Sequence, residues 1–357
     1  MKKQIFKNAF IAFVILALFA NVFTSCKTEE VLPVDKTVIT ALLSEYQAIA
    51  NAASTLDYSQ AAITSFKATL ATAVTALENK KITQVAVDNL VVQLKEAKIL
   101  FFAAAYQAIP ANALLMGMSF DETVTANQFT TAGKPWTANL MKGPSEVFGT
   151  ATNFPSFVPG KVGNAIYLSN GSNLQINNYV AADLLGKQLS FAVWVKPDST
   201  RAGNYIISYN YWNSWKFQLQ SENKPFFTVH TNADGWVDAD NEAVNSAPNK
   251  AWTHLVVTLN MDTKKLTFYV NGALTKEWTA TTKTGLTGTG AFAYPKTLPL
   301  IIGAATTYAE ANAEWGWWTN RNPQGWDSFI GALDELKIYN TSLSAGQVNK
   351  LYRDENK

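Results

Sequence analysis

The chain is poor in cysteine and histidine, which often act as the nucleophile or the base of an enzyme. Its 357 residues include one cysteine, Cys26, so no disulfide can form within the chain, and two histidines, His230 and His254. A catalytic nucleophile needs a base beside it, and no Ser or Cys motif surrounds either histidine. We interpret His254 as a hydrogen-bonded structural imidazole and name no partner for His230. The sequence gives little support to nucleophilic catalysis.

The N-terminal apolar run is too short to span a membrane. It extends from Ala9 to Phe23, is interrupted only by Asn21 and follows three lysines. A transmembrane helix needs about 20 apolar residues, whereas a basic start followed by a shorter apolar run is typical of a secretory signal peptide. We expect residues 1–25 to be such a peptide.

Cys26 follows this run directly. Its position resembles a bacterial lipoprotein signal, in which the peptide is cut before the Cys and the thiol carries a lipid, although Phe23 stands where Leu is usual. The alternative is a buried free Cys in a retained anchor. Lys27-Thr28-Glu29-Glu30 resembles a short signal that sends lipoproteins of some Gram-negative, glycan-degrading bacteria to the outer face of the outer membrane. We expect lipidation at Cys26, a linker over residues 26–35, and exposure to the cell exterior.

The mature chain has no excess of either charge. Removal of residues 1–25 takes away three lysines and leaves 26 basic and 27 acidic side chains. A nearly neutral chain offers no electrostatic reason to expect a nucleic acid as partner.

Residues 36–109 lack Gly, Pro and Trp, whereas all 19 Gly and all 11 Trp follow Pro110. Apolar residues recur there at helical spacing in three sets, which predicts an antiparallel three-helix bundle. Asp35, Ser59 and Thr83 are the expected N-caps. We interpret the bundle as a stalk; the alternative is that its Ala- and Thr-rich faces bind a partner helix. The three sets are Val38, Leu42, Tyr46, Ile49; Ile63, Phe66, Leu70, Val74, Leu77; and Val87, Leu90, Leu94, Ala97, Phe101.

Beyond Pro110 the chain changes to short alternating runs separated by turn residues, which indicates an antiparallel sandwich. Asn271-Gly272 is the strongest hairpin signal. The runs are Phe191 to Val195, Trp215 to Leu219, Leu255 to Leu259, Leu266 to Val270 and Leu333 to Tyr339.

Several motifs then follow in a fixed order. They are Ser119-Phe120-Asp121-Glu122, Gly160-Lys161-Val162-Gly163-Asn164-Ala165, Leu189 to Pro197, Trp252-Thr253-His254, Phe268 to Gly272, Leu300 to Gly303, and Gly331 to Asn340 with Leu343-Ser344. Their order resembles a laminin G-like domain of the concanavalin A-like superfamily, over residues 113–355. The resemblance implies a mainly β fold, a jelly roll of two antiparallel sheets preceded by the small three-helix bundle. It also implies carbohydrate or protein ligands and, often, one structural calcium ion.

The resemblance further suggests where calcium would bind. Relatives hold the ion with a carboxylate of the closing strand and oxygen groups of the opening strand. Asp334 matches the first position and Asp121 lies in the second segment. The alternative for Asp334 is a carboxylate that accepts backbone hydrogen bonds.

Asp238-Ala239-Asp240-Asn241-Glu242 suggests an enzyme alternative. Retaining glucanases of the same superfamily carry carboxylates at alternate strand positions. Asp238 and Glu242 would lie about 13 Å apart on an extended strand, whereas a retaining pair of carboxyl groups needs about 5 Å. We expect a solvated loop here, with calcium binding or catalysis as alternatives.

The exposed aromatic residues are the predicted ligand contacts. Four tryptophans fall between Trp315 and Trp326 among Gly, Asn and Pro, in a segment typical of a surface loop. An exposed indole suits the apolar face of a sugar while Asn, Gln and Arg bind its hydroxyls; the alternative is that the loops bury their own indoles. The candidates are Trp212, Asn213, Trp215, Trp236, Trp315, Trp317, Trp318, Asn320, Arg321, Gln324 and Trp326. Trp194, Trp252 and Trp278 are expected to pack within strands.

Together these patterns predict a surface lipoprotein whose jelly roll binds a polysaccharide or oligosaccharide without cleaving it. Neighbouring glycan-uptake proteins are further expected partners. The alternatives are a retaining glycoside hydrolase and an adhesin with a protein ligand.

Overall fold

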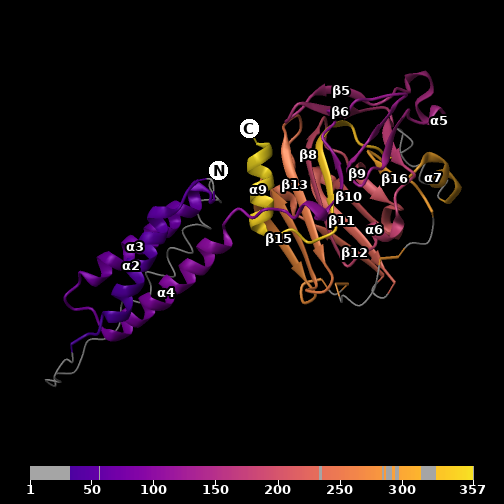
Figure 1. Ribbon diagram of the computed structural model, residues 1–357. Coiled ribbons are helices and arrows are strands. Elements are labelled where there is room, and N and C mark those ends of the chain that lie inside the picture. Colours follow the sequence, from indigo (N-terminus) through magenta and orange to yellow (C-terminus); the bar gives the residue numbers. More distant parts are fainter. Residues whose placement is uncertain are drawn as a thin grey trace.

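The computed structural model describes residues 33–55, 57–232, 235–283, 285–286, 292–293, 297–314 and 327–356. The predicted signal peptide, Cys26 and residues 315–326 lie outside these ranges. Three N-terminal helices are joined by an extended connector to a two-sheet sandwich (Figure 1). Within the described ranges, no helix combines the length and the apolar character that crossing a membrane requires.

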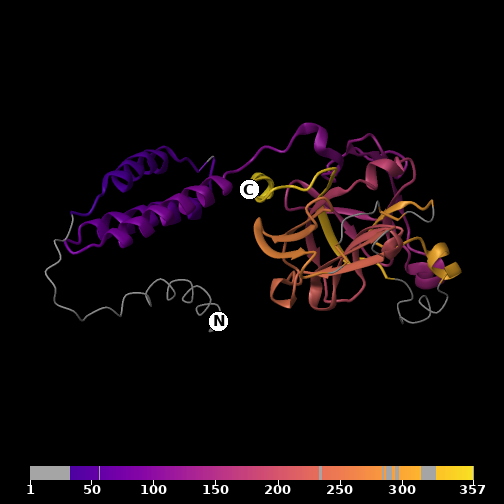
Figure 2. The ribbon, with the colours of Figure 1, turned by 90° about the horizontal axis from the view of Figure 1, so that it is seen from below.

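The predicted bundle is formed by α2 (Thr37–Ala52), α3 (Gln60–Leu77) and α4 (Gln84–Ala103), which stand clear of the sandwich (Figure 2). Ser59 and Thr83 cap α3 and α4, because their hydroxyl oxygens accept hydrogen bonds from Ala62 N at 3.1 Å and Ala86 N at 3.2 Å. The expected cap Asp35 is wrong by one position, since the N-cap of α2 is Lys36.

The predicted apolar stripes face the bundle core, except at the start of α2. In α2, Tyr46 is buried as expected, and Leu42 and Ile49 are partly buried against the core. Ile39 and Leu43 are buried there, whereas Val38 is 57% exposed. Because apolar residues occupy adjacent positions at 38–39 and 42–43, spacing alone did not determine which of them faces inward.

The sandwich has two antiparallel sheets. One has eight strands in the order β12 (Gly235–Asp240), β11 (Lys224–Thr231), β10 (Trp215–Gln220), β9 (Asn204–Tyr209), β16 (Leu300–Ile302), β7 (Asn173–Ile176), β4 (Thr137–Met141) and β2 (Gln128–Thr130). The other has nine: β15 (Ala273–Thr279), β14 (Lys265–Val270), β13 (Thr253–Asn260), β8 (Gln188–Pro197), β17 (Gly331–Tyr339), β1 (Leu114–Met118) and β3 (Ala132–Gly133), with β6 (Asn164–Leu168) beside β17 and β5 (Ser156–Pro159) beside β6.

Short helices connect the strands. They are α5 (Ser145–Phe148), α6 (Ala181–Leu184), α7 (Tyr308–Glu314), α9 (Ala345–Glu355), and the 3-10 turns η1 (Ala111–Ala113), η2 (Gly149–Ala151), η3 (Tyr211–Asn213), η4 (Ser221–Asn223) and η5 (Ala243–Asn245). The views of Figures 1 and 2 both place α5 and α7 at the end of the sandwich farther from the bundle, and α9 at the nearer end.

The sandwich core lies between the sheets, where alternate strand residues interdigitate, as the period-two pattern predicted. Asn271 and Gly272 form the expected turn between β14 and β15, with φ of 50° and 77°. Such positive φ values are those of the tight hairpin turns that Asn-Gly favours.

Two segments correct the expectations from sequence. The alternation of the closing strand is broken at Glu335, whose φ is 50°, and the β8–β17 register shifts there. Leu333 before this bulge and Leu336 after it therefore both face the core. The segment expected to be an acidic loop is instead the edge strand β12, which ends at Asp240.

The C-terminal helix α9 covers the outer face of the nine-stranded sheet through Val348. Its buried Glu355 accepts a hydrogen bond from Trp194 Nε1 at 2.8 Å and pairs with Lys337. The connector from the bundle is held by the same helix, because Gln107 N donates to Gly346 O at 3.1 Å. The helix thus joins the two parts of the molecule.

Candidate functional site

The outer face of the eight-stranded sheet carries a row of polar side chains. Ser208, Lys216, Thr228 and Asp238 lie directly opposite one another on β9, β10, β11 and β12. The residues between them, such as Phe217, Phe227 and Val237, point into the sandwich core. Strand alternation therefore places this polar row on the surface that faces away from the core.

The adjacent row on the same face ends in an exposed aromatic. Trp236 of β12 is 59% exposed, and its direct cross-strand neighbour is His230 of β11. The two rings stack with centroids 4.8 Å apart and planes inclined by 27°. His230 Nδ1 lies 3.2 Å from Asn213 O, which supports the imidazole beneath the indole. One indole face is thus covered and the residue remains open to solvent.

Asp238 is the next outward residue of β12, two positions from Trp236. It is exposed, and its Oδ1 accepts a hydrogen bond from Thr228 Oγ1 at 2.6 Å. Trp236 and Asp238 are therefore each braced by a cross-strand neighbour on β11.

Inward from this edge, Lys216 occupies the centre of the face. It is only 6% exposed, hydrogen-bonds to Gln218, and lies 5.2 Å from the ring centroid of Tyr205 and 4.9 Å from that of Phe226. Burial lowers the pKa of Lys216 to about 8, against the attraction of nearby carboxylates, which raises it.

Three polar side chains near Lys216 are buried, and their polar atoms have no hydrogen-bond partner among the described residues: Ser208, Asn210 and Ser214. Such groups are uncommon in native proteins. They make this face a place where a polar ligand or ordered water would be stabilised.

Among the sequence-predicted contacts, Asn213 and Trp236 are brought together through His230. Trp212 packs edge-on to Tyr211, with centroids 4.5 Å apart, and borders a small cluster with Ala305 on this face. The expectation for Trp215 is corrected: it is fully buried in the sandwich core, and its Nε1 donates to Leu184 O at 3.1 Å. A ligand on the surface does not reach it.

Trp315, Trp317, Trp318, Asn320, Arg321, Gln324 and Trp326 lie outside the described residues. The residues that flank this segment lie on the same outer face. On one side, Ala311 of α7 packs against Ile301 of β16. On the other, Asp327 lies so close to Gly203 that a Cβ there would overlap its carboxylate.

The three carboxylates of residues 238–242, on which the enzyme alternative depends, have separate partners. Asp238 accepts from Thr228, Asp240 Oδ2 lies 3.3 Å from Lys224 Nζ, and Glu242 pairs with Lys276. Each is engaged in a different local contact, so the arrangement gives no specific support to a retaining pair.

The predicted calcium ligands flank one loop. Asp334 is fully buried, and its Oδ2 accepts hydrogen bonds from Lys161 N at 2.7 Å and Val162 N at 2.9 Å. Asp121 Oδ1 accepts from Asn164 N at 2.8 Å. Burial raises the pKa of Asp334 to about 7, against these backbone hydrogen bonds, which lower it.

This donor set does not fit a cation at Asp334, because amide N–H groups point at the oxygen that would bind it. Groups of three or more acidic, His or Cys side chains suited to a metal do not occur within the described ranges. The hydrogen-bonded alternative considered for Asp334 is what the structure shows. Calcium binding stays a prediction from the resemblance.

His254 is a buried structural residue beside Trp194, with ring centroids 5.1 Å apart and planes inclined by 41°. The hydrogen bond expected for it is absent among the described residues, and its Nε2 lies 3.6 Å from Glu355 Oε2. Burial lowers the pKa of His254 to about 3, and nearby Lys337 lowers it further.

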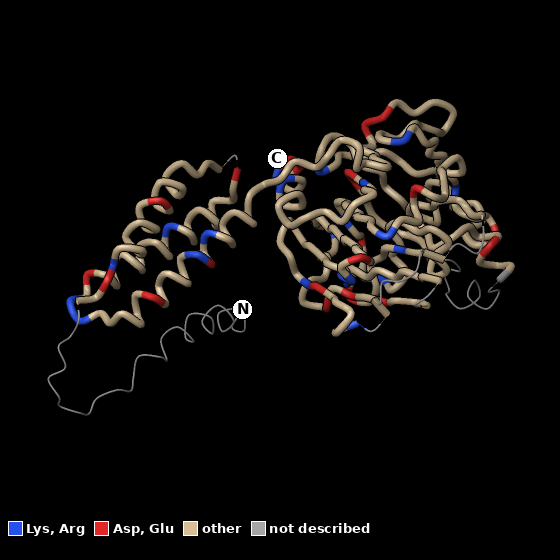
Figure 3. Tube along the Cα trace, turned by 60° about the horizontal axis from the view of Figure 1, so that its bottom comes forward, with Lys and Arg blue, Asp and Glu red and all other residues tan. Residues whose placement is uncertain are grey.

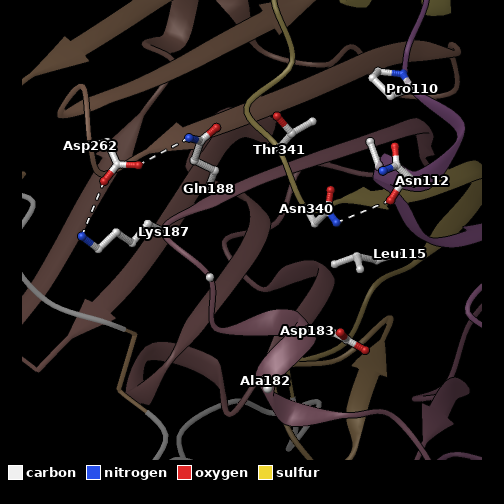
Figure 4. A pocket seen from close by; sticks show the side chains of 12 residues that line it. Pro110, Asn112, Leu115, Ala182, Asp183, Lys187, Gln188, Asp262, Asn340 and Thr341 are labelled. Carbon is white, nitrogen blue, oxygen red and sulfur yellow. Dashed lines mark hydrogen bonds and ion pairs between the residues drawn. The ribbon is translucent and has the colours of Figure 1, made fainter.

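A cleft of about 620 Å³ opens at another part of the sandwich, beside the connector (Figure 4). Lys187 and Gln188 both contact Asp262 there, at 3.5 and 3.4 Å, and Asp183 lies on α6 across from them. The described residues that line the cleft include no aromatic side chain and none of the predicted ligand contacts. The cleft thus lacks a surface on which a sugar ring could stack.

Sequence reasoning missed His230 and Thr228 as supports of the site, and it placed Asp238 in a loop. The available signal was the run Phe226 to Val229 followed by Asn232 to Gly235, a strand and a turn after which a second strand can pair.

Several solved structures are similar to part of this chain. Domain 4 of AbnA, an extracellular arabinanase from Geobacillus stearothermophilus solved with arabinotriose, is 17% identical over 67% of this chain and 98% of its own, with a TM-score of 0.46. The binding domain of Paraclostridial Mosquitocidal Protein 1 is 14% identical over 68% of this chain, with a TM-score of 0.46. The binding domain of Botulinum neurotoxin DC, solved with rat synaptotagmin II, is also 14% identical, over 69% of this chain, with a TM-score of 0.46. For each of these two toxin domains the likeness spans 52% of the compared chain.

No curated protein sequence matches the chain. A family model described as the concanavalin A-like lectin/glucanases superfamily matches residues 168–349, just over half of the chain. The predicted laminin G-like jelly roll is therefore confirmed, and this chain belongs to the concanavalin A-like lectin/glucanases superfamily.

Proposed function

We propose that this protein is a non-catalytic, glycan-binding lipoprotein of the cell surface, and that β12 and the neighbouring outer face of its sheet contact the glycan. The observation that carries the proposal is Trp236, whose indole is 59% exposed and is supported by His230 at 4.8 Å. Among the described residues no aromatic side chain is more exposed. An indole held flat and open on one side suits the apolar face of a sugar ring.

Polar groups beside the indole would bind the sugar hydroxyls. Asp238 lies two residues along the strand, about 6.6 Å away at the backbone, with Oδ1 held by Thr228. A carboxylate accepts hydrogen bonds at both oxygens, so the braced Asp238 can accept from a ligand hydroxyl. The predicted contacts among residues 315–326, which lie outside the described residues, would add further aromatic side chains.

Binding is tested with a polysaccharide panel, by gel mobility and by assay of new reducing ends. We expect retarded mobility without oligosaccharide release. Trp236→Ala should weaken binding by about tenfold or more, since truncating a central aromatic contact costs about 1 to 2 kcal/mol. Trp252→Ala is the matched control, because this partly buried indole precedes β13 of the other sheet and contacts Lys196 at 5.8 Å.

Three outcomes would contradict the proposal. Equal affinity of the Trp236→Ala protein and the parent would show that β12 is not the site. Release of oligosaccharides would favour a retaining hydrolase. Capture of a protein ligand with no glycan bound would favour an adhesin.

The lipid anchor is a separate part of the proposal and rests on the sequence alone. Whole cells fed an alkyne-tagged fatty acid should label the parent protein, whereas Cys26→Ala should remain unlabelled and retain its uncut N-terminus. Protease added to intact cells should remove the jelly roll of the parent if it faces the exterior. Labelling that persists in Cys26→Ala would refute the anchor. If the bundle is a stalk, a protein lacking residues 36–108 should capture less glycan on cells.

A further inference from the structure

The charge next to the proposed sugar platform is negative and open to solvent. Asp238 is exposed, and none of the ion pairs between described residues includes it. The next carboxylate along the strand, Asp240, is partly neutralised by Lys224 at 3.3 Å. Figure 3 shows that acidic and basic residues are mixed over the rest of the chain.

The nearby positive charge, that of Lys216, is buried, whereas Asp238 is exposed. Lys216 is 6% exposed, its Nζ lies over the rings of Tyr205 and Phe226, and none of the ion pairs between described residues includes it. It attracts Asp238 from within the face and does not cover that carboxylate from the solvent side. A ligand resting on Trp236 therefore approaches Asp238 first.

The orientation of Asp238 is also set. Thr228 Oγ1 donates to Oδ1 at 2.6 Å, and Thr228 itself is fully buried, so the hydroxyl fixes this oxygen from the neighbouring strand β11. The carboxylate keeps further acceptor capacity toward a ligand. It can accept hydrogen bonds from sugar hydroxyls, but a ligand carboxylate or sulfate at the same place offers no proton and repels it.

Resting on the proposed function, we infer that this site selects neutral glycans and rejects acidic ones, because Asp238 both accepts the ligand's hydroxyl protons and repels a ligand carboxylate or sulfate beside Trp236. Asp238 would thus determine specificity by an unfavourable contact with the wrong ligand as much as by a favourable contact with the right one.

The test compares a matched pair of ligands. One is the neutral glycan of the panel that binds most tightly, and the other is the same glycan after oxidation of its primary alcohols to carboxylates. The parent protein should bind the oxidised glycan at least about tenfold more weakly, since like charges in contact disfavour association. Asp238→Asn keeps an acceptor oxygen without the charge, so its preference for the neutral form should fall to about twofold or less.

Two controls identify the cause. Asp262→Asn removes an exposed carboxylate beside the distant cleft, and should keep the parent's preference for the neutral over the oxidised glycan. Raising the salt from about 0.01 M to about 1 M shortens the Debye length from about 30 Å to about 3 Å. This should reduce the ratio of affinities for the neutral and the oxidised glycan in the parent, but not in Asp238→Asn.

Equal or tighter binding of the oxidised glycan by the parent would overturn the inference. An acidic polymer as the tightest ligand of the panel would overturn it as well. In both cases the protein would still be shown to bind a glycan. Failure of every neutral and acidic glycan to bind would instead overturn the proposed function, and the inference with it. The salt dependence of the parent decides the question if Asp238→Asn does not fold.

Discussion

Gly346 of α9 lies against the backbone carbonyl of Ala105, so closely that a Cβ at position 346 would overlap the carbonyl oxygen. The adjacent connector residue Gln107 donates its N–H to Gly346 O at 3.1 Å, and Arg353 lies 4.2 Å from the ring centroid of Tyr106. The connector between bundle and sandwich is therefore packed onto a helix of the sandwich.

Gly346→Ala should detach this connector without weakening α9 itself, because Ala favours helix over Gly by about 1 kcal/mol. We expect faster cleavage of the connector near residues 104–110 by limited proteolysis, with the jelly roll left intact. Lys350→Ala, on the same helix but in an ion pair with Asp354 of that helix, is the control and should leave the cleavage rate unchanged. Equal rates for all three proteins would mean that the contact does not hold the connector.

Asp334 should make stability depend on pH. Its pKa in the folded chain is about 7, against about 3.9 in the unfolded chain. Between these values the folded state binds a proton that the unfolded state has lost, so the free energy of unfolding falls as pH rises from about 4 to about 7. The difference in urea midpoint between the parent and Asp334→Asn, followed from pH 4 to pH 8, isolates this contribution. If the difference in urea midpoint does not vary with pH, Asp334 does not contribute to the pH dependence of stability.

The calcium prediction and the hydrogen bonds of Asp334 lead to different expectations for the effect of calcium on the melting temperature. With two backbone N–H groups donating to its Oδ2, we expect the melting temperature to be the same in excess calcium and in a chelator. A ligand that binds only the folded state raises stability by RT ln(1 + [L]/Kd). A calcium-dependent rise that Asp121→Asn or Asp334→Asn abolishes would establish the predicted site instead.

Trp317 and Trp318 remain predicted ligand contacts, although they lie outside the described residues. The double substitution Trp317→Ala/Trp318→Ala should weaken glycan binding by about tenfold or more while the thermal transition stays that of the parent. Isothermal titration with the tightest glycan of the panel measures this. Unchanged affinity would restrict the site to β12 and its neighbours.

Several parts of the fold could be predicted because they depend on local pattern. Residues 36–109 lack Gly and Pro and repeat at helical spacing, and the helices form there. Asn271-Gly272 forms its turn because few other residues adopt two successive positive φ values. Trp215 was misassigned even though its pattern held the answer, since Phe217 and Leu219 share its face and are core residues.

The amino-acid sequence alone determined the order of the elements, the jelly-roll family and the separation of helical and sheet-rich parts, because these depend on composition and on residue spacing along the chain. Only the tertiary structure decided which side chains meet. His230 lies beneath Trp236 and Thr228 holds Asp238 because β11 and β12 pair in one particular register. A shift of β12 by one residue would turn Trp236 and Asp238 to the other face of the sheet, away from His230 and Thr228.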